Sequence, residues 1–203
     1  MKIYNEVIFD IETQRFYDEV SDPELFGVSI LSLYARIVDE NLSEIKGEMF
    51  SFFEPDVKKS WEHFSKADRV IGFNSKKFDI PVLKPYLPPE FLKLPHFDIL
   101  EQIKEINGKR VSLNAVSRET IGRQKVDTGG NAIIYWQKKD EASLNKLKYY
   151  CEEDVLITKE IYDFAIKNKK LKFKDFWNSV RVIDVDFSYP KMEEKQDLQT
   201  ALF

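Results

Sequence analysis

Residues 7–13 read Val-Ile-Phe-Asp-Ile-Glu-Thr, an apolar run that ends in two carboxylates one residue apart. Valine, isoleucine and phenylalanine favour β-strands, and residues i and i+2 of a strand point to the same face. Asp10 and Glu12 are therefore expected to point at one spot. Like charges at that spacing repel each other, and a hard divalent cation with oxygen ligands would relieve the repulsion. The stretch leaves open the alternative of a strand that ends in two solvated acids.

The composition bounds the class of protein. The chain has 203 residues, 43% of them hydrophobic and 33% charged, which is typical of one soluble globular domain with a sizeable core. Its single cysteine, Cys151, excludes an intramolecular disulfide and fits a reducing cytoplasm. With only His63 and His96 as histidines, a zinc site of the usual His/Cys kind is not expected. The net charge of −4 does not by itself indicate a nucleic-acid binder.

The order of the expected elements predicts an α/β fold. After the strand through residues 7–13, apolar alternation predicts strands at 27–37 and 48–53, with turns at 39–41 and 46–47. These three strands would form an antiparallel meander. Helices are then expected at 55–67, 78–86, 99–106, 112–121, 132–138 and 143–169, and short strands at 69–73 and 94–97. The pattern predicts a mixed sheet of five to six strands, the first three antiparallel, flanked by helices.

The sequence changes character after the long helix. Residues 171–177 interleave lysines with Phe173, Phe176 and Trp177. Residues 181–187 alternate and predict either a late strand or an extended strip over the core. From Pro190 the chain is polar, and a mobile tail is expected there. We therefore expect one domain over residues 1–189 and a flexible C-terminal tail over 190–203.

Two further stretches place an acid where it needs a partner. Residues 71–81 predict a buried strand that ends at Asn74, then a short loop and a helix that begins near Asp79. A carboxylate there can simply cap the helix. Within the long helix, Tyr150 and Asp154 are four residues apart and lie on one face. A core-facing Asp beside a tyrosine needs a partner, and the alternative is an exposed helix acid.

Taken together, the three stretches resemble the DEDD 3′–5′ exonucleases of the ribonuclease H-like superfamily. Residues 9–13 match that family's D-x-E motif, 74–79 its N-x-x-x-F-D motif, and 150–154 the tyrosine form of its third motif, Y-x-x-x-D. The other branch of the family carries a histidine where this chain has Tyr149. Over about residues 5–168, the chain looks most similar to the proofreading exonuclease of B-family DNA polymerases and its stand-alone relatives.

The resemblance implies a ribonuclease H-like fold and two Mg²⁺ or Mn²⁺ ions about 4 Å apart. The implied metal ligands are Asp10, Glu12, Asp79 and Asp154, with Asp10 as the bridging ligand. Tyr150 would orient the attacking water and would not be a strong base, because a phenol has a pKa of about 10. The implied product is a nucleoside 5′-monophosphate.

Substrate contacts are expected around the second motif. Nucleic acid that approaches four carboxylates needs positive charge nearby, and the cations at 76–77, 109–110 and 118–125 could supply it or could be ordinary solvated side chains. The residues expected to contact the strand are Thr13, Asn74, Lys76, Lys77 and Phe78. The aromatic residues that could stack a terminal base, or else pack in the core, are Phe16, Tyr17, Tyr135 and Trp136.

The remaining polar features are expected to be structural. Asp184-x-Asp186 repeats the spacing of the first motif but falls outside the family pattern, and we expect a surface pair. Asp98 is expected to cap a helix. The two histidines and Cys151 are expected to pack rather than to bind a ligand.

The last five residues, Gln199 to Phe203, read Gln-Thr-Ala-Leu-Phe. They resemble the bacterial sliding-clamp binding peptide, with Gln199, Leu202 and Phe203 as its contacts and the polar tail as a tether. The alternative is a terminus that ends in Leu-Phe by chance.

The sequence thus predicts a monomeric, cytoplasmic, metal-dependent 3′–5′ exonuclease that acts on single-stranded DNA ends in replication or repair. One alternative keeps the chemistry and changes the substrate to RNA, since nothing in the sequence clearly recognises a 2′-hydroxyl. Another alternative is a nucleic-acid-binding module on the same fold that no longer cuts. The complete set of four acids and Tyr150 favours the enzyme.

Overall fold

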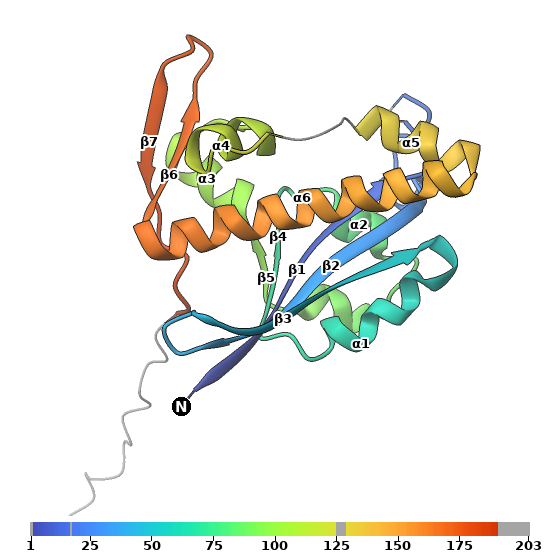
Figure 1. The fold of residues 1–203 in the computed structure, drawn as a ribbon, viewed down its shortest axis with the longest axis horizontal. Helices are drawn as coiled ribbons and strands as arrows, with labels where there is room; N and C mark the ends of the chain where they lie inside the picture. The colour runs from blue at the N-terminus through green and yellow to red at the C-terminus, as the bar shows by residue number, and fades with distance from the viewer. Residues whose placement is uncertain (1, 17, 125–128, 191–203) are drawn as a thin grey trace, which may run out of the picture.

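The fold is a five-stranded mixed sheet covered by helices (Figure 1). The computed structural model describes residues 2–16, 18–124 and 129–190. The strands are β1 (Ile3–Thr13), β2 (Val28–Asp39), β3 (Glu44–Phe53), β4 (Arg69–Gly72) and β5 (His96–Asp98), in the order β3-β2-β1-β4-β5. The first three pair antiparallel, whereas β4 runs parallel to β1 and β5 parallel to β4. The predicted α/β architecture is therefore confirmed.

Helices connect these strands, except between β2 and β3, and more helices follow β5. The α-helices are α1 (Trp61–Phe64), α2 (Asp79–Leu83), α3 (Ile99–Asn107), α4 (Leu113–Thr120), α5 (Gly129–Lys138) and α6 (Glu141–Asn168). The 3₁₀ helices are η1 (Pro23–Leu25), η2 (Glu54–Ser60) and η3 (Pro89–Lys93). The long helix α6, orange in Figure 1, runs across the sheet and packs on β1 and β2. Among the described residues, no helix is long and apolar enough to span a membrane.

Two cores follow from the side-chain alternation along β1. Val7, Phe9 and Ile11 point into one core, which is completed by side chains from η2, α1, α2 and η3. Ile8 points the other way, into a core formed with α3, α4 and α6. Because side chains alternate along a strand, Asp10 and Glu12 share the parity of Ile8. The strand therefore presents both carboxylates on the face that α6 covers.

Strand β3 corrects one predicted turn. It begins at Glu44 rather than at residue 48, and it includes Lys46 and Gly47, which we expected in a turn. A Cβ on Gly47 would lie 2.3 Å from the Tyr34 hydroxyl oxygen, so the Tyr34 side chain occupies the space over this glycine. Gly47 is a strand residue that allows a close approach.

The helix predicted at 55–67 is also different. Residues 54–60 form the 3₁₀ helix η2, and only Trp61–Phe64 is α-helical. Val57 and Ser60 are both buried, and residues three apart share a face in a 3₁₀ helix. The two buried residues of η2 therefore have the spacing of the tighter helix, whereas the apolar residues Val57, Trp61 and Phe64 have the spacing that predicted an α-helix.

A hairpin follows α6, formed by β6 (Lys170–Lys174) and β7 (Val180–Asp184) as a separate two-stranded sheet. We did not predict β6, although Leu171 and Phe173 alternate with lysines and are buried. For residues 181–187 both alternatives hold in part: β7 ends at Asp184, and the buried Val185 and Phe187 then continue as a strip over the core.

A buried charge network lies near the start of β1. The fully buried Glu6 accepts hydrogen bonds from Arg36 Nε at 2.9 Å, Tyr162 Oη at 3.1 Å and Tyr189 Oη at 3.0 Å. Arg36 also pairs with Asp163 at 2.7 Å. Arg69 Nη1 donates to Tyr162 Oη at 2.7 Å, and the Arg69 guanidinium lies 3.7 Å from the ring centre of Tyr189. The network joins β1, β2, β4, α6 and the strip after β7.

Candidate functional site

Three carboxylates converge where β1 meets the middle of α6. One oxygen from each of Asp10, Glu12 and Asp154 lies within 4.8 Å of the other two. Glu12 is 9% exposed and Asp154 2% exposed, while Asp10 is half-buried. The strand supplies two acids to one spot by its alternation, and the helix supplies the third from a distant part of the chain. The structure brings these three acids together, as the sequence predicts.

Tyr150 lies one helical turn before Asp154 and is 3% exposed. Burial is the main cause that raises its pKa above the usual value, followed by the negative charges of Asp154, Glu12 and Asp10 and by a hydrogen bond with the Asp154 side chain. A phenol with a raised pKa stays protonated at neutral pH. Its hydroxyl is therefore a hydrogen-bond donor at the acidic cluster, and not a base.

Cys151 of α6 packs against β1 next to the acidic cluster. Its side chain is fully buried, and Sγ lies 3.5 Å from the backbone oxygen of Asp10 and 4.0 Å from Asp10 Oδ2. Burial raises the pKa of the thiol well above its usual value, and the charges of Asp10 and Glu12 add to the effect. This confirms the prediction of a small packed residue.

One residue of α6 that the sequence did not single out helps to hold the helix in place. Glu152 Oε1 accepts a hydrogen bond from Ser51 Oγ of β3 at 2.6 Å, and Ser51 Oγ lies 3.0 Å from Ser32 Oγ of β2. These contacts fix the rotation of α6 about its axis. Glu152 therefore helps to keep Tyr150 and Asp154 turned toward β1.

The second motif forms a tight loop after β4. A Cβ on Gly72 would lie 2.5 Å from both Cβ and Oγ of Ser75, so only glycine allows the chain to fold back here. Asn74 has a positive φ of 66°, which asparagine tolerates better than most residues. The loop is thus built from residues that suit its backbone.

Asp98 has two roles, of which the sequence predicted one. Its carboxylate caps α3 by accepting the backbone N–H of Leu100 at 2.9 Å, as expected. The same carboxylate accepts the N–H of Asn74 at 2.8 Å and of Lys76 at 3.1 Å. One side chain therefore holds both the helix and the loop of the second motif. No local sequence pattern predicts the second role, because Asn74 and Asp98 are brought together only by the pairing of β4 with β5.

Asp79 is buried at the start of α2, with 5% of its surface exposed. It is the first residue of the helix rather than its N-cap, a position that Phe78 holds. Among the described residues, the group of acids within 4.8 Å of one another comprises Asp10, Glu12 and Asp154 and does not include Asp79. The assignment of Asp79 as a fourth ligand remains a prediction.

The predicted substrate contacts lie in several environments. Asn74 Oδ1 accepts a hydrogen bond from Arg110 Nη2 at 2.8 Å, and Lys76 Nζ pairs with Glu101 at 2.6 Å. Lys77 lines a pocket of about 250 Å³ together with Asn74 and Arg110. The buried Thr13 donates its hydroxyl to the backbone oxygen of Arg15 at 3.1 Å. Phe78 packs against Phe26, with ring centres 5.5 Å apart.

The candidate stacking residues are partly buried. Tyr135 and Trp136 pack against the small core of Ile30, Ala132, Leu147, Tyr150 and Cys151. Phe16 is half-buried, and Tyr17 lies outside the described residues. So do Gln199, Leu202 and Phe203, the residues of the predicted clamp-binding peptide.

The other polar residues behave as expected. Asp184 and Asp186 are both exposed, and Asp186 pairs with Lys169 at 2.9 Å. The His63 ring lies tilted against the Phe50 ring, with centres 4.1 Å apart, and His96 Nε2 lies 2.7 Å from the Phe91 carbonyl oxygen. Both histidines pack, and the exposed acid pair is separate from the cluster on β1 and α6.

A comparison with protein families identifies the fold. A family model, RNase_H_2, described as RNase_H superfamily, matches residues 7–166. The chain belongs to the RNase H superfamily. The match runs from the start of the first motif to beyond Asp154, so it spans all three stretches that carry the acids. No curated protein matches the chain.

Membership of the RNase H superfamily agrees with the strand order and with the acidic cluster. A member of this superfamily with acids gathered at one end of β1 is consistent with a nucleic-acid-processing enzyme. The cluster offers only hard oxygen ligands, which suit divalent cations such as Mg²⁺ and Mn²⁺. Asp10, Glu12 and Asp154 could therefore hold metal ions.

Proposed function

We propose that this RNase H superfamily protein is a metal-dependent 3′–5′ exonuclease of the DEDD type. It would remove nucleoside 5′-monophosphates from single-stranded DNA ends. The observation that carries the proposal is the convergence of Asp10, Glu12 and Asp154, with the buried Tyr150 one helical turn before Asp154. Asp79 is proposed as the fourth ligand, from its place in the second motif and its burial at the start of α2.

The donor set, three carboxylates, suits divalent cations, and we propose that it holds two of them. Three carboxylates this close to one another in a partly buried site repel each other, so a cation there lowers the energy of the folded protein. Bound Mg²⁺ or Mn²⁺ would supply activation of the attacking water and stabilisation of charge on the leaving oxygen. The protein's own part is to place the ligands, which β1 and α6 do with backbone geometry.

Tyr150 has a positioning part in the proposed reaction. Its raised pKa keeps the hydroxyl protonated, and its single proton is donated to the Asp154 carboxylate, so the phenol oxygen can accept a hydrogen bond from a water and hold that water in line. Its bond to Asp154 fixes the hydroxyl at the cluster. Asn74 and Phe78 would shape the groove that holds the terminal nucleotides, with Thr13, Lys76 and Lys77 around it.

The proposal is tested by the direction and products of cleavage. A 5′-labelled single-stranded DNA incubated with Mg²⁺ should shorten progressively from its 3′ end, release nucleoside 5′-monophosphates, and stay intact with EDTA. Asp79→Asn should abolish shortening if Asp79 is a ligand. Asp184→Asn makes the same change of Asp to Asn at an exposed residue away from the acidic cluster, and this control should retain activity.

The same assay separates the alternatives. Faster shortening of a matched RNA would make the protein an exoribonuclease. Binding without cleavage under every metal condition would identify a non-cleaving module. Release of nucleotides from the 5′ end would overturn the proposed polarity. The clamp interaction is a separate proposal: removal of Leu202 and Phe203 should abolish capture on an immobilised bacterial clamp and leave cleavage of short oligonucleotides unchanged.

A further inference from the structure

The β6–β7 hairpin projects beside α3 and α4, away from the central sheet (Figure 1). Its base is packed, since Leu171 and Phe173 are buried. Its turn is not, because Phe176 is 95% exposed and Trp177 70% exposed. Two large aromatic side chains that are adjacent and in solvent are unusual on a folded protein and indicate a binding surface.

The turn that carries these aromatic residues is firmly built. Asp175 Oδ1 accepts the backbone N–H of Trp177 and of Ser179, each at 3.0 Å. Asp175 Oδ2 accepts Arg181 Nε at 2.7 Å. Asn178 completes the turn with a positive φ of 61°. The exposed rings therefore stand on a hydrogen-bonded support and not on a loose loop, which reduces the entropy lost on binding.

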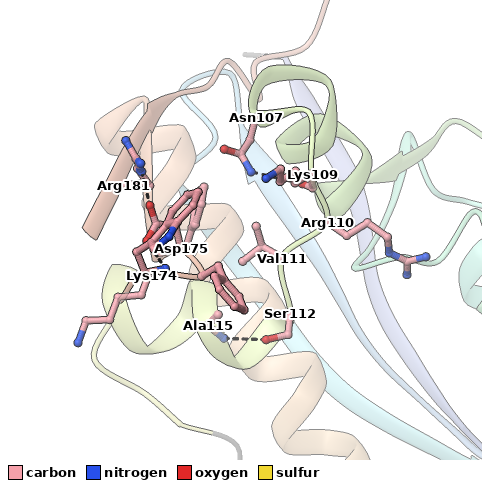
Figure 2. A pocket seen from close by; sticks show the side chains of 12 residues that line it. Asn107, Lys109, Arg110, Val111, Ser112, Ala115, Lys174, Asp175 and Arg181 are labelled. Carbon is pink, nitrogen blue, oxygen red and sulfur yellow. Dashed lines mark hydrogen bonds and ion pairs between the residues drawn. The ribbon is translucent and has the colours of Figure 1, made fainter. Parts of the chain in front are cut away.

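A pocket of about 540 Å³ lies between this hairpin and the turn that joins α3 to α4 (Figure 2). We call it the hairpin groove. Its lining includes Phe176 and Trp177 and four cations, Lys109, Arg110, Lys174 and Arg181. Lys109 Nζ lies 6.0 Å from the ring centre of Trp177. Arg181 pairs with the single lining carboxylate, Asp175, and Lys174 with Glu119, so the excess positive charge of this groove comes from Lys109 and Arg110.

The groove continues toward the second motif through Arg110. Figure 2 shows the Arg110 side chain reaching away from Lys109 and Ser112. Arg110 lines the hairpin groove and also the neighbouring pocket that contains Asn74 and Lys77. Its Nη2 donates to Asn74 Oδ1 at 2.8 Å. Among the described residues, the side-chain contacts of Lys109 and Arg110 are with neutral groups, an indole ring and an amide oxygen, so both positive charges remain available to an anion.

We propose that the hairpin groove binds the part of a single-stranded nucleic acid that lies upstream of the nucleotide being removed. This inference rests on the proposed exonuclease function and adds a second substrate contact to it. Bases would stack on Trp177 and Phe176, and the phosphodiester backbone would follow Lys109 and Arg110 toward Asn74. Exposed aromatic rings interleaved with unpaired cations are the features that bind single strands without sequence preference.

Equilibrium binding tests the groove without cleavage. A labelled single-stranded DNA is titrated with the full-length protein in EDTA, with fluorescence anisotropy as the readout. Trp177→Ala should raise Kd about tenfold to a hundredfold, as expected for the loss of one stacked base. Lys109→Ala should weaken binding at low salt and reduce the slope of log Kd against log salt by about 1. Lys58→Ala, an exposed lysine on η2, is the matched charge control and should bind as the wild type does.

Substrate length supplies the second readout. With Mg²⁺, the loss of kcat/KM caused by Trp177→Ala should be large on a long single strand and should shrink on a trinucleotide that cannot reach the groove. Matched RNA identifies whether the groove accepts both sugars. A duplex should bind less tightly, because its bases are not free to stack.

The outcomes distinguish the two proposals. If Trp177→Ala and Lys109→Ala bind and cleave long strands as the wild type does, the groove proposal is wrong and the exonuclease proposal stands. If the wild type cleaves no substrate, and Trp177→Ala binds single strands more weakly than the wild type, the exonuclease proposal is wrong and single-strand binding by the groove is confirmed. The groove proposal is also wrong if both variants bind single strands as the wild type does but lose binding to a protein partner.

Discussion

The two ends of β1 present acids to the same helix, and the two ends differ in what meets those acids. Glu6, Asp10 and Glu12 share one face of the strand, the face that α6 covers. Glu6 meets the guanidinium of Arg36 and the hydroxyls of Tyr162 and Tyr189. Asp10 and Glu12 meet a third carboxylate, Asp154.

The distance between the Glu6 network and the acidic cluster is about the same along α6 as along β1. Asp154 and Tyr162 are eight residues apart on α6, which is about 12 Å along a helix axis. Glu6 and Asp10 are four residues apart on β1, about 13 Å along a strand. One strand and one helix running past each other thus build both sites. The difference teaches that the chain itself supplies a cation to one buried acid, Glu6, whereas the three gathered acids could hold a cation from outside.

The sharpest test of this contrast is Asp10→Asn. The substitution keeps the shape of the side chain and removes one ligand charge, so nuclease activity should fall by about a thousandfold or more, in line with several kcal/mol of lost transition-state stabilisation. The free energy of unfolding without metal should not fall, because repulsion within the cluster decreases. Initial rates on single-stranded DNA and urea denaturation measure the two effects. A fully active variant would refute the assigned site.

Arg36→Met tests the other end of β1. It leaves Glu6 buried without its cation, and the free energy of unfolding should fall by about 3–5 kcal/mol, the usual cost of breaking a buried pair. Lys66→Met, which removes an exposed partner of Glu62, is the control and should cost less than about 1 kcal/mol. A double variant in which Glu6→Leu accompanies Arg36→Met should recover part of the loss. Equal stability of Arg36→Met and wild type would show that the contrast is not energetic.

Tyr150→Phe separates positioning from proton transfer. Loss of the hydroxyl should lower the rate about 10- to 100-fold, as for other groups that orient a ligand at a metal site. Because the pKa of Tyr150 is raised, its hydroxyl stays neutral at every pH below about 10, the usual pKa of a tyrosine. The wild-type rate should therefore not change with pH through tyrosine ionisation below about pH 10. Single-turnover rates against pH provide the check. A wild-type profile with a tyrosine limb near neutral pH, absent in Tyr150→Phe, would instead make the phenol a base.

The smallest expected effect is stabilisation by Mn²⁺. Saturating metal should add about 1–3 kcal/mol to the free energy of unfolding of the wild type, since a ligand of the folded state alone stabilises it by mass action. Arg36→Met should gain as much as the wild type, whereas Asp10→Asn should gain little. Differential scanning fluorimetry with and without Mn²⁺ measures the shift in Tm. Equal gains in all three proteins would place the metal elsewhere.

Much of the site follows from local rules, and the rest does not. Alternation along β1 predicts that Asp10 and Glu12 share a face, and helical spacing predicts that Tyr150 and Asp154 do. The order of strands and helices predicts the architecture. The partners of Glu6, the second role of Asp98 and the support that Glu152 gives to α6 depend on which distant elements meet, and no local spacing encodes those meetings. The sequence wrongly predicts a turn at Gly47, because the Tyr34 side chain that requires this glycine lies on the neighbouring strand.

The single cysteine has a practical consequence for experiments on the hairpin. Cys151 is fully buried and its thiol is held protonated, so it should react slowly with maleimides in the folded protein. Ser179→Cys, at an exposed residue of the same turn that does not line the groove, could then carry a dye or a cross-linker without first replacing the native thiol. Such a probe would report directly on what approaches the groove and would leave both exposed aromatic rings in place.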